Sequence, residues 1–286
     1  MQMIIPHKKS VLSYYDCISS MANIQVNDVN MEIYKECIGS DDELRCLQWF
    51  GMESLAKLRE TIEIYGSWPE GVLKGSALMD VIKAPDLPSV RRKKSWGARG
   101  SRLSITKLYN GKINRMYRSV KKEISEGRRN KRQPVNIVID LTAGAKTHSD
   151  SYFWRGALGV VLAKELMKSG RSVRILAGCS IRNFSKDSNY RGRRNFTCLL
   201  NVKPYGESVD YNKLFALTGL AGIFRYYFFK SIFALNTPIR DRIGSVCSLD
   251  EEMLAPVVDN NTTIIIENVW NEESAVHRAQ NILGNL

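Results

Sequence analysis

The most regular pattern of apolar and polar positions lies in the second half of the chain. Val135 to Leu141 is a run of β-branched and aliphatic residues between a proline and a turn, which is typical of a buried parallel strand. Apolar positions at helical spacing predict a helix from about Tyr152 to Met167, and Ser172 to Ala177 predicts a second strand. These elements form a strand–helix–strand unit that should be parallel and cross over with a right hand.

The same alternation continues to the carboxyl end. Strands are predicted at Phe196 to Val202 and Thr262 to Glu267, and helices at Asp210 to Phe233 and Glu272 to Leu283. Strands that alternate with helices favour an α/β layer. Residues 134–286 are therefore predicted to form a Rossmann-like α/β domain, with a mostly parallel sheet and flanking helices.

The first ninety residues carry a helical pattern instead. Between Glu43 and Tyr65 the apolar residues recur close to every 3.6 positions. Asp42 stands where a helix N-cap belongs, and Gly66 stands where the helix should stop. A further helix is predicted through Ile82. Residues 1–90 are therefore predicted to form a helical N-terminal region ahead of the sheet.

The net charge of +13 is concentrated in one segment. Residues 91–132 hold 16 basic and 2 acidic residues, a balance of +14, while residues 1–90 balance at −5 and residues 133–286 at +4. Like charges at this density repel one another, so the segment needs a polyanion or open exposure to water. Residues 91–133 are therefore expected to be a basic segment or linker, with a helix from about Ile113 to Ile124.

Aromatic residues stand between the charges of the basic segment, namely Trp96, Tyr109 and Tyr117. Cations contact phosphates and release counterions, while flat rings stack on unpaired bases, so the combination points to DNA or RNA. A second basic cluster lies in the loop between the second and third predicted strands. The candidate nucleic-acid-binding residues are Arg91, Arg92, Lys93, Lys94, Trp96, Arg128, Arg129, Lys131, Arg132, Arg191, Arg193 and Arg194. A solvated basic face is the alternative; an anionic membrane surface ranks lower, because no amphipathic apolar stripe accompanies the charge.

The end of the first predicted strand is the best candidate for a ligand site. In open parallel sheets ligands bind outside the carboxyl ends of the strands, and Asp140 closes this strand. Asp140 and Thr142 partly resemble the von Willebrand A fold, in which an acidic residue and two serines after the first strand help hold a divalent cation, but the second hydroxyl is missing here. Arg155, in the predicted helix, either reaches a ligand there or pairs with Asp140. Asp140 could also simply cap the loop, and we predict no bound metal.

Other classes of function find no support in the sequence. The six cysteines and three histidines do not have the spacing of a zinc site, so free thiols are expected. No glycine-rich nucleotide-binding motif follows a predicted strand, and no cofactor is expected. No stretch of eighteen apolar residues occurs, which argues against a membrane span. We expect a cytoplasmic protein.

Three segments together resemble a known family. They are Gly66 to Gly71, Ser95 to Gly97 ahead of Leu103 to Gly111, and Asp140 to Thr142 with Phe153 to Ala157. Their order is similar to that in a family of uncharacterised proteins encoded mainly by bacteriophages and prophages, known only as a domain of unknown function. The resemblance covers about residue 45 to the carboxyl end. It implies phage origin and a von Willebrand A-like or Rossmann-like sheet behind a helical part, and it brings no activity and no catalytic residue. For a phage-encoded chain, the expected cytoplasmic location is the host cytoplasm.

The sequence thus leads to one functional hypothesis and two alternatives. The hypothesis is a phage-type, non-enzymatic nucleic-acid-binding protein that acts in replication, transcription or packaging. One alternative is a protein–protein interaction module of von Willebrand A type, in which the carboxyl edge of the sheet docks a partner. The other is a metal-dependent phosphoryl-transfer enzyme, which needs several carboxylates at one edge, where only Asp140 and Glu267 or Asp210 are placed.

Overall fold

The computed structural model describes most of the chain, with gaps. The described residues are 2–7, 10–39, 42–82, 92–97, 102–103, 116–121, 133–182, 195–239, 245–249, 251–258 and 262–285. The chain divides into two compact units. The first comprises Met1–Pro85, Gln133–Met167 and Arg171–Leu286, and the second comprises Asp86–Arg132 and Lys168–Gly170.

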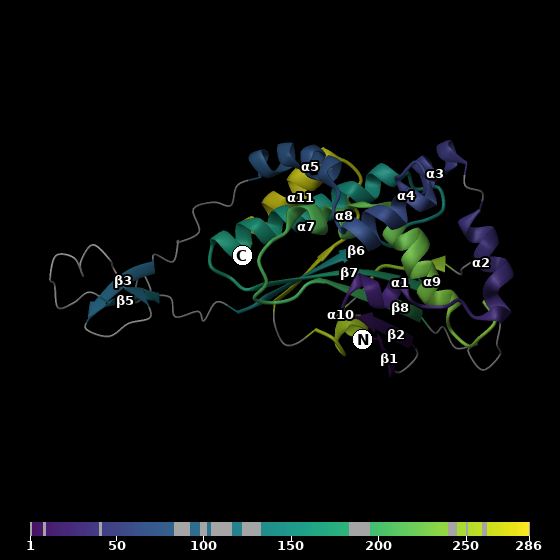
Figure 1. The fold of residues 1–286 in the computed structure, drawn as a ribbon, viewed down its shortest axis with the longest axis horizontal. Coiled ribbons are helices and arrows are strands. Elements are labelled where there is room, and N and C mark those ends of the chain that lie inside the picture. The colour runs from purple at the N-terminus through teal and green to yellow at the C-terminus, as the bar shows by residue number, and fades with distance from the viewer. Residues whose placement is uncertain are drawn as a thin grey trace. The chain divides into compact units, whose positions relative to one another are not determined.

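The first unit is built on one mixed sheet with the strand order β1-β2-β8-β7-β6-β10 (Figure 1). In that order the strands are Gln2–His7, Ser10–Tyr15, Asn195–Lys203, Val173–Arg182, Val135–Asp140 and Thr262–Ile266, and the short β9, Ser245–Val246, pairs with β7. The pairs β10–β6, β6–β7 and β2–β8 are parallel, and β1–β2 and β7–β8 are antiparallel. Strands β1, β7, β6 and β10 therefore run in one direction, which confirms the prediction of a mostly parallel α/β sheet.

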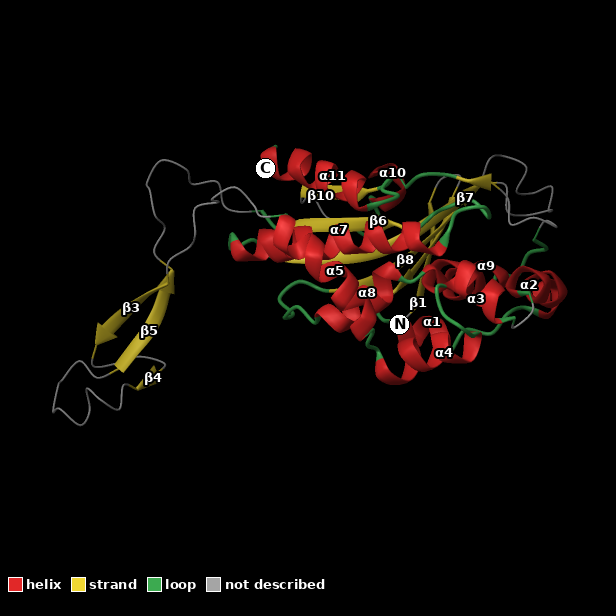
Figure 2. Cartoon of the chain, turned by 90° about the horizontal axis from the view of Figure 1, so that it is seen from above, coloured by secondary structure: helices red, strands yellow, loops and turns green. Residues whose placement is uncertain are grey.

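The predicted strand–helix–strand unit is confirmed. β6 pairs with β7 in parallel, and α7 (Ser149–Lys168) connects them and runs across the sheet above them (Figure 2). Every residue of β6 is buried, which explains its nearly continuous apolar run. Gly159 lets α7 approach the strand, because a Cβ there would lie 2.4 Å from the Ile139 side chain.

The remaining helices cover mainly one face of the sheet. Helices α5 (Pro69–Val81), α7, α8 (Tyr211–Gly219) and α11 (Glu272–Gly284) lie on one side, and the short α10 (Glu251–Leu254) lies on the other (Figure 1). The core is divided accordingly. Ile137 and Ile139 of β6 belong to the large cluster under the helices, and Val138 between them belongs to the smaller cluster that contains Leu254 of α10. Alternate residues of a strand point to opposite faces, so this sheet buries both.

The first eighty-two residues are mostly helical, as predicted, but they begin with strands. The helical elements are α1 (Ile18–Ala22), η1 (Asp28–Asn30), α2 (Met31–Ile38), α3 (Glu43–Phe50), α4 (Leu55–Arg59), the π-helical η2 (Glu60–Tyr65) and α5. The Asp42 side chain accepts a hydrogen bond from the Arg45 amide, which confirms the N-cap. The single helix predicted from Glu43 to Tyr65 was wrong, because Gly51 adopts φ +80° and ends α3. The β1–β2 hairpin, which joins the sheet beside β8, was not predicted.

The helix predicted from Asp210 to Phe233 is also interrupted. It consists of α8, the π-helical η4 (Ile223–Phe228) and α9 (Phe229–Phe233), and the break after α8 lies at Leu220, which is not helical. The Asp210 side chain caps α8 by accepting a hydrogen bond from the Lys213 amide. η4 matters for the site described below, because it carries the buried Arg225.

The second unit contains a small antiparallel sheet of order β3-β5-β4. Its strands are Arg92–Gly97, Met116–Lys121 and Arg102–Leu103. The helix predicted from Ile113 to Ile124 was therefore wrong across β5. Intrinsic helix preference is a weak signal, and here the hydrogen bonds of β5 are made with β3 and β4 instead.

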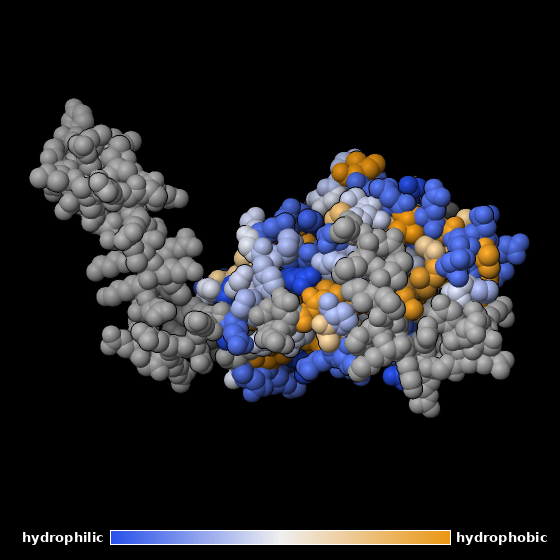
Figure 3. Space-filling model, turned by 90° about the horizontal axis from the view of Figure 1, so that it is seen from below, coloured by the Kyte–Doolittle hydropathy of each residue, from blue (hydrophilic) through white to orange (hydrophobic). Residues whose placement is uncertain are grey.

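Two further expectations concern the whole chain. All six cysteines fall within the described residues and are free thiols. Among the described residues, no helix is long and apolar enough to cross a membrane. Figure 3 shows one face of the molecule, on which hydrophilic side chains separate the apolar patches of the coloured residues.

Candidate functional site

The carboxyl end of β6 holds a buried carboxylate. Asp140 is 3% exposed, and both of its side-chain oxygens accept main-chain hydrogen bonds. Oδ1 accepts from the Thr142 amide at 2.8 Å, and Oδ2 accepts from the Leu249 amide at 3.1 Å. Burial raises the pKa of Asp140, while these hydrogen bonds act in the opposite direction. Asp140 therefore ties the loop after β6 to the segment after β9, as the loop-capping alternative expected.

Thr142 extends this connection to the next strand. Its hydroxyl oxygen accepts a hydrogen bond from the Ser180 amide of β7 at 2.9 Å. Asp140 and Thr142, the two candidates for a cation site, therefore both hold neighbouring main-chain segments through their side-chain oxygens.

Arg155 lies in the second turn of α7 and is 3% exposed. Its Nη1 donates to the main-chain carbonyl oxygens of Asp140 at 2.9 Å and Thr142 at 2.7 Å, and its Nε donates to that of Val269 at 3.3 Å. The structure thus brings Arg155 to Asp140, but the hydrogen bond is to the carbonyl rather than the carboxylate. Burial lowers the pKa of Arg155, and the Asp140 charge counteracts this.

A second buried arginine, Arg225, holds the other side of the same loop. It is 1% exposed and lies within the apolar η4. Nη1 donates to the carbonyl oxygens of Gln48 and Trp49, and Nη2 donates to those of Gly144 and Thr147. Burial lowers the pKa of Arg225.

The guanidinium of Arg225 also lies over two aromatic rings. It is 4.0 Å from the centre of the Trp49 ring and 5.0 Å from that of Tyr152. Sequence reasoning did not identify this residue; its only signal is that it is one of two cations, with Lys230, inside a long apolar stretch.

Together the two arginines fix residues 141–148. Arg155 binds the start of this loop at Thr142, and Arg225 binds its middle and end at Gly144 and Thr147. A guanidinium presents several donors in a fixed plane, so each arginine holds its carbonyl partners in one geometry. The β6–α7 loop is therefore a pre-organised platform at the edge where ligands of open α/β sheets bind.

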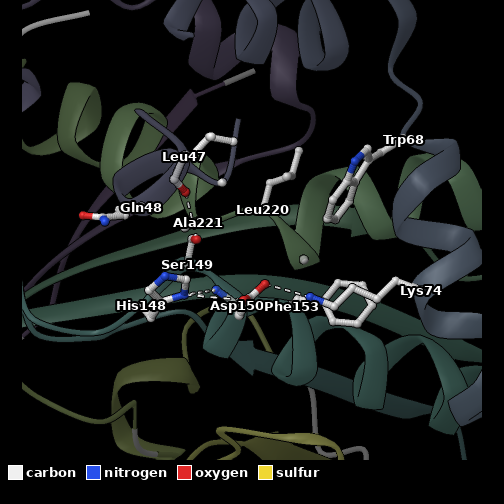
Figure 4. A pocket seen from close by; sticks show the side chains of 12 residues that line it. Leu47, Gln48, Trp68, Lys74, His148, Ser149, Asp150, Phe153, Leu220 and Ala221 are labelled. Atoms are coloured by element: carbon white, nitrogen blue, oxygen red, sulfur yellow. Dashed lines mark hydrogen bonds and ion pairs between the residues drawn. The ribbon is translucent and has the colours of Figure 1, made fainter. Parts of the chain in front are cut away.

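One cavity beside this loop, of about 250 Å³, lies at the amino terminus of α7 (Figure 4). Lys74 Nζ lies 2.7 Å from Asp150 Oδ1, and His148 Nδ1 lies 3.5 Å from Asp150 Oδ2. Lys74 also lies 4.5 Å above the centre of the Phe153 ring, and Ser149 Oγ donates to the Leu47 carbonyl oxygen at 2.9 Å. Lys74 and His148 thus both contact Asp150 in this cavity, and the Ser149 hydroxyl already donates a hydrogen bond to the main chain.

The second cavity, of about 180 Å³, opens at the end of β6 and β10. It is lined in part by Asp140, Arg155, Glu267, Asn268 and Trp270, and we call it the edge cavity. Among the described residues no group of three or more histidine, cysteine, aspartate or glutamate side chains is arranged to hold a metal ion. Asp210 caps α8 and does not line this cavity. In the described part of the chain, Asp140 and Glu267 are therefore the only carboxylates that line the edge cavity, where the phosphoryl-transfer alternative needs several.

Nine of the twelve candidate nucleic-acid-binding residues belong to the second unit, and Arg191, Arg193 and Arg194 belong to the first. Arg92, Lys93, Lys94 and Trp96 belong to β3. Outside the described residues lie Arg91, Arg128, Arg129, Lys131, Arg132, Arg191, Arg193 and Arg194. The register of the small sheet pairs Trp96 with Tyr117 and Tyr117 with Arg102. Sequence spacing did not reveal this juxtaposition, because it depends on β5 being a strand.

The fold and this edge define an α/β protein in which N-terminal helices precede a mixed, mostly parallel sheet with flanking helices. A model of a domain of unknown function (DUF7192) matches residues 9–286, and the chain belongs to that family. The match begins earlier than the resemblance in the sequence motifs, so it includes the β2 strand. Neither the curated proteins nor the solved structures contain a significant match to the chain.

Proposed function

We propose that this protein binds nucleic acid through the sheet of its second unit. The proposal rests on the position of cations and aromatic residues in that sheet, within a segment that carries 16 basic and 2 acidic residues. It includes a non-enzymatic role in the replication, transcription or packaging of a phage genome. The phage setting, like the von Willebrand A-like character of the larger sheet, follows from the resemblance of the sequence motifs.

The register of the small sheet sorts its residues into two faces. Residues at directly paired positions share a face, and successive residues of a strand alternate between faces. Trp96, Tyr117 and Arg102 are paired across the three strands and therefore share one face. The same face, called here the basic-aromatic face, consists of Arg92, Lys94, Trp96, Arg102, Tyr117, Ser119 and Lys121. The opposite face has Lys93 and Arg118 as its basic residues among the described positions.

This distribution matches what a nucleic-acid strand requires. Four cations share a face with two adjacent aromatic residues. Cations neutralise phosphates along a backbone, and each stacked base contributes about 1–3 kcal/mol in proteins that bind single strands. Adjacent aromatic positions therefore favour an unpaired strand over a duplex, whose bases are already stacked on one another.

Matched substitutions on the two faces test the proposal. The double variant Lys94→Ser with Lys121→Ser removes two charges from the basic-aromatic face; Lys93→Ser with Arg118→Ser removes two from the opposite face. The log–log salt slope is about −0.7 per neutralised phosphate, so losing two contacts should flatten it by about 1.4. Relative to 1 M salt, this weakens single-strand binding at 0.1 M salt roughly 25-fold. The second variant should bind nearly as the wild type does. Fluorescence anisotropy with a labelled oligonucleotide measures both, and equal losses would contradict the assignment of the face.

A docking surface is the second candidate, and a specific observation favours it. Leu44, Ile64 and Leu73 are 72%, 74% and 74% exposed on α3, η2 and α5. They are the three most exposed large apolar side chains among the described residues, and exposed apolar patches mark protein interaction sites. The elements that carry them also contribute to a cavity of about 330 Å³ bounded by Leu47, Tyr65 and other residues. This candidate becomes the leading one if the wild-type protein binds no nucleic acid.

A further inference from the structure

The edge cavity lies where two parallel strands end side by side. Ile139 of β6 pairs with Ile266 of β10, so Asp140 and Glu267 follow at neighbouring positions of the same edge. Ligands of open α/β sheets bind outside the carboxyl ends of such strands. The cavity measures about 180 Å³. A cavity of about 150 Å³ in another protein takes a benzene ring, so this space suits one flat ring system.

Two charged groups of the cavity have hydrogen-bonding capacity that no described residue uses. Arg155 is 3% exposed and donates three hydrogen bonds through Nε and Nη1, whereas its Nη2 donates to no described residue. Glu267 is half-buried, and its carboxylate makes no hydrogen bond and no ion pair within 4.0 Å with a described residue. Its charge nevertheless acts on Arg155 through space. A donor on Arg155 and an acceptor on Glu267 thus line the same cavity without a hydrogen bond or ion pair between them.

Trp270 supplies a partly exposed aromatic ring beside these groups, with Arg155 over one of its faces. The guanidinium of Arg155 lies 4.3 Å from the centre of its ring, and the residue is 45% exposed. Its main chain is fixed, because its amide donates to Ser274 Oγ at 3.1 Å at the start of α11. Asn268 adopts φ +56° and is the one described residue other than glycine at positive φ. This left-handed residue turns the chain between β10 and α11, with Glu267 and Trp270 on either side of the turn.

These three groups define the chemistry of the ligand. A carboxylate only accepts hydrogen bonds, and a guanidinium only donates them. The ligand should therefore carry donors and an acceptor along one edge of a flat ring that lies against the exposed part of an indole. Guanine has this arrangement: its O6 accepts, and the adjacent N1–H and N2–H₂ donate, whereas adenine presents no carbonyl acceptor. We propose that the edge cavity binds a guanine base, with Arg155 Nη2 donating to O6, Glu267 accepting from N1–H and N2–H₂, and the exposed part of the Trp270 ring lying against the base.

Calorimetric titration of the full chain with GMP and with AMP tests the proposal. GMP should bind at least about tenfold more tightly than AMP. Glu267→Gln keeps the side-chain size and removes the charge and one acceptor, so it should weaken GMP binding roughly 10- to 100-fold. Trp270→Ala should weaken GMP and AMP alike, since both bases would contact the exposed part of the indole. Glu273→Gln, the same substitution at an exposed position of α11, should leave GMP binding unchanged.

The base could be presented by a free nucleotide or by a strand, and oligonucleotides distinguish the two. A thymidine oligonucleotide with one central guanosine is compared with the same oligonucleotide carrying adenosine. A guanosine preference that Glu267→Gln abolishes, without GMP binding, supports the site and assigns it to a strand. Equal binding of GMP and AMP would overturn the proposal. A preference for GMP, or for the guanosine oligonucleotide, that Glu267→Gln leaves unchanged would also overturn it. The proposal would also be overturned if GMP did not bind and the two oligonucleotides bound equally well. Binding of an all-thymidine strand reports the basic-aromatic face alone, so failure of one proposal is visible without the other.

Discussion

Replacing Arg225 with methionine is expected to lower the free energy of unfolding by at least about 3 kcal/mol. Four main-chain carbonyl oxygens accept hydrogen bonds from this guanidinium, two from α3 and two from the β6–α7 loop. Bonds to a charged group contribute about 1.5–3 kcal/mol each, and buried acceptors left without a donor carry their desolvation cost. Methionine fills part of the volume but supplies no donor.

Denaturant unfolding followed by circular dichroism measures this loss. Arg225→Lys keeps the charge but has one nitrogen instead of a planar fork, so it should lie between the wild type and Arg225→Met. Arg278→Met, at an exposed position of α11, should change stability by no more than about 0.5 kcal/mol. A stability of Arg225→Met equal to that of Arg278→Met would mean that the loop is not held by Arg225.

Replacing Arg128, Arg129, Lys131 and Arg132 together with serine is expected to weaken nucleic-acid binding several-hundredfold at 0.1 M salt. If each cation neutralises one phosphate, four lost contacts flatten the log–log salt slope by about 2.8 for a single strand, which corresponds to this factor relative to 1 M salt. These residues lie outside the described part of the chain, so the prediction rests on charge alone. It is measured by anisotropy titrations at several salt concentrations.

A charge-conserving variant is the control for this change. With Arg128, Arg129 and Arg132 replaced by lysine, the slope should stay at the wild-type value, because a lysine also neutralises a phosphate. An unchanged slope in the serine variant, with the fold intact by circular dichroism, would mean that this run of charges faces solvent and contacts no strand.

The strand–helix–strand unit could be predicted because its signals are local. The apolar run from Val135, the polar residues ahead of α7 and the glycine after it each act within a few residues of the element that they define. The same reasoning placed Arg155 near Asp140. It could not show that the arginine binds carbonyl oxygens, because that depends on how α7 is rotated over the sheet.

The remaining features depend on contacts between distant segments. Arg225 reaches carbonyl oxygens about 80 and 180 residues away in the sequence, and no pattern around it announces those partners. β2 is a strand because it pairs with β8, far along the chain, while six residues alone carry little signal. β5 was predicted as a helix for the same reason. A helix at this position does not place Trp96 opposite Tyr117, so their pairing across β3 and β5 could not be predicted.

Binding of the wild-type chain to a labelled single-stranded oligonucleotide, titrated from about 50 to 500 mM salt, decides whether the basic segment is a nucleic-acid interface. Four cations on the basic-aromatic face require a linear log–log plot with a slope of about −2.8 or steeper, and nanomolar to micromolar affinity at the lowest salt. No detectable binding at the lowest salt, or an affinity that does not change with salt, would contradict the proposed function and leave the exposed apolar surface of α3, η2 and α5 as the functional surface.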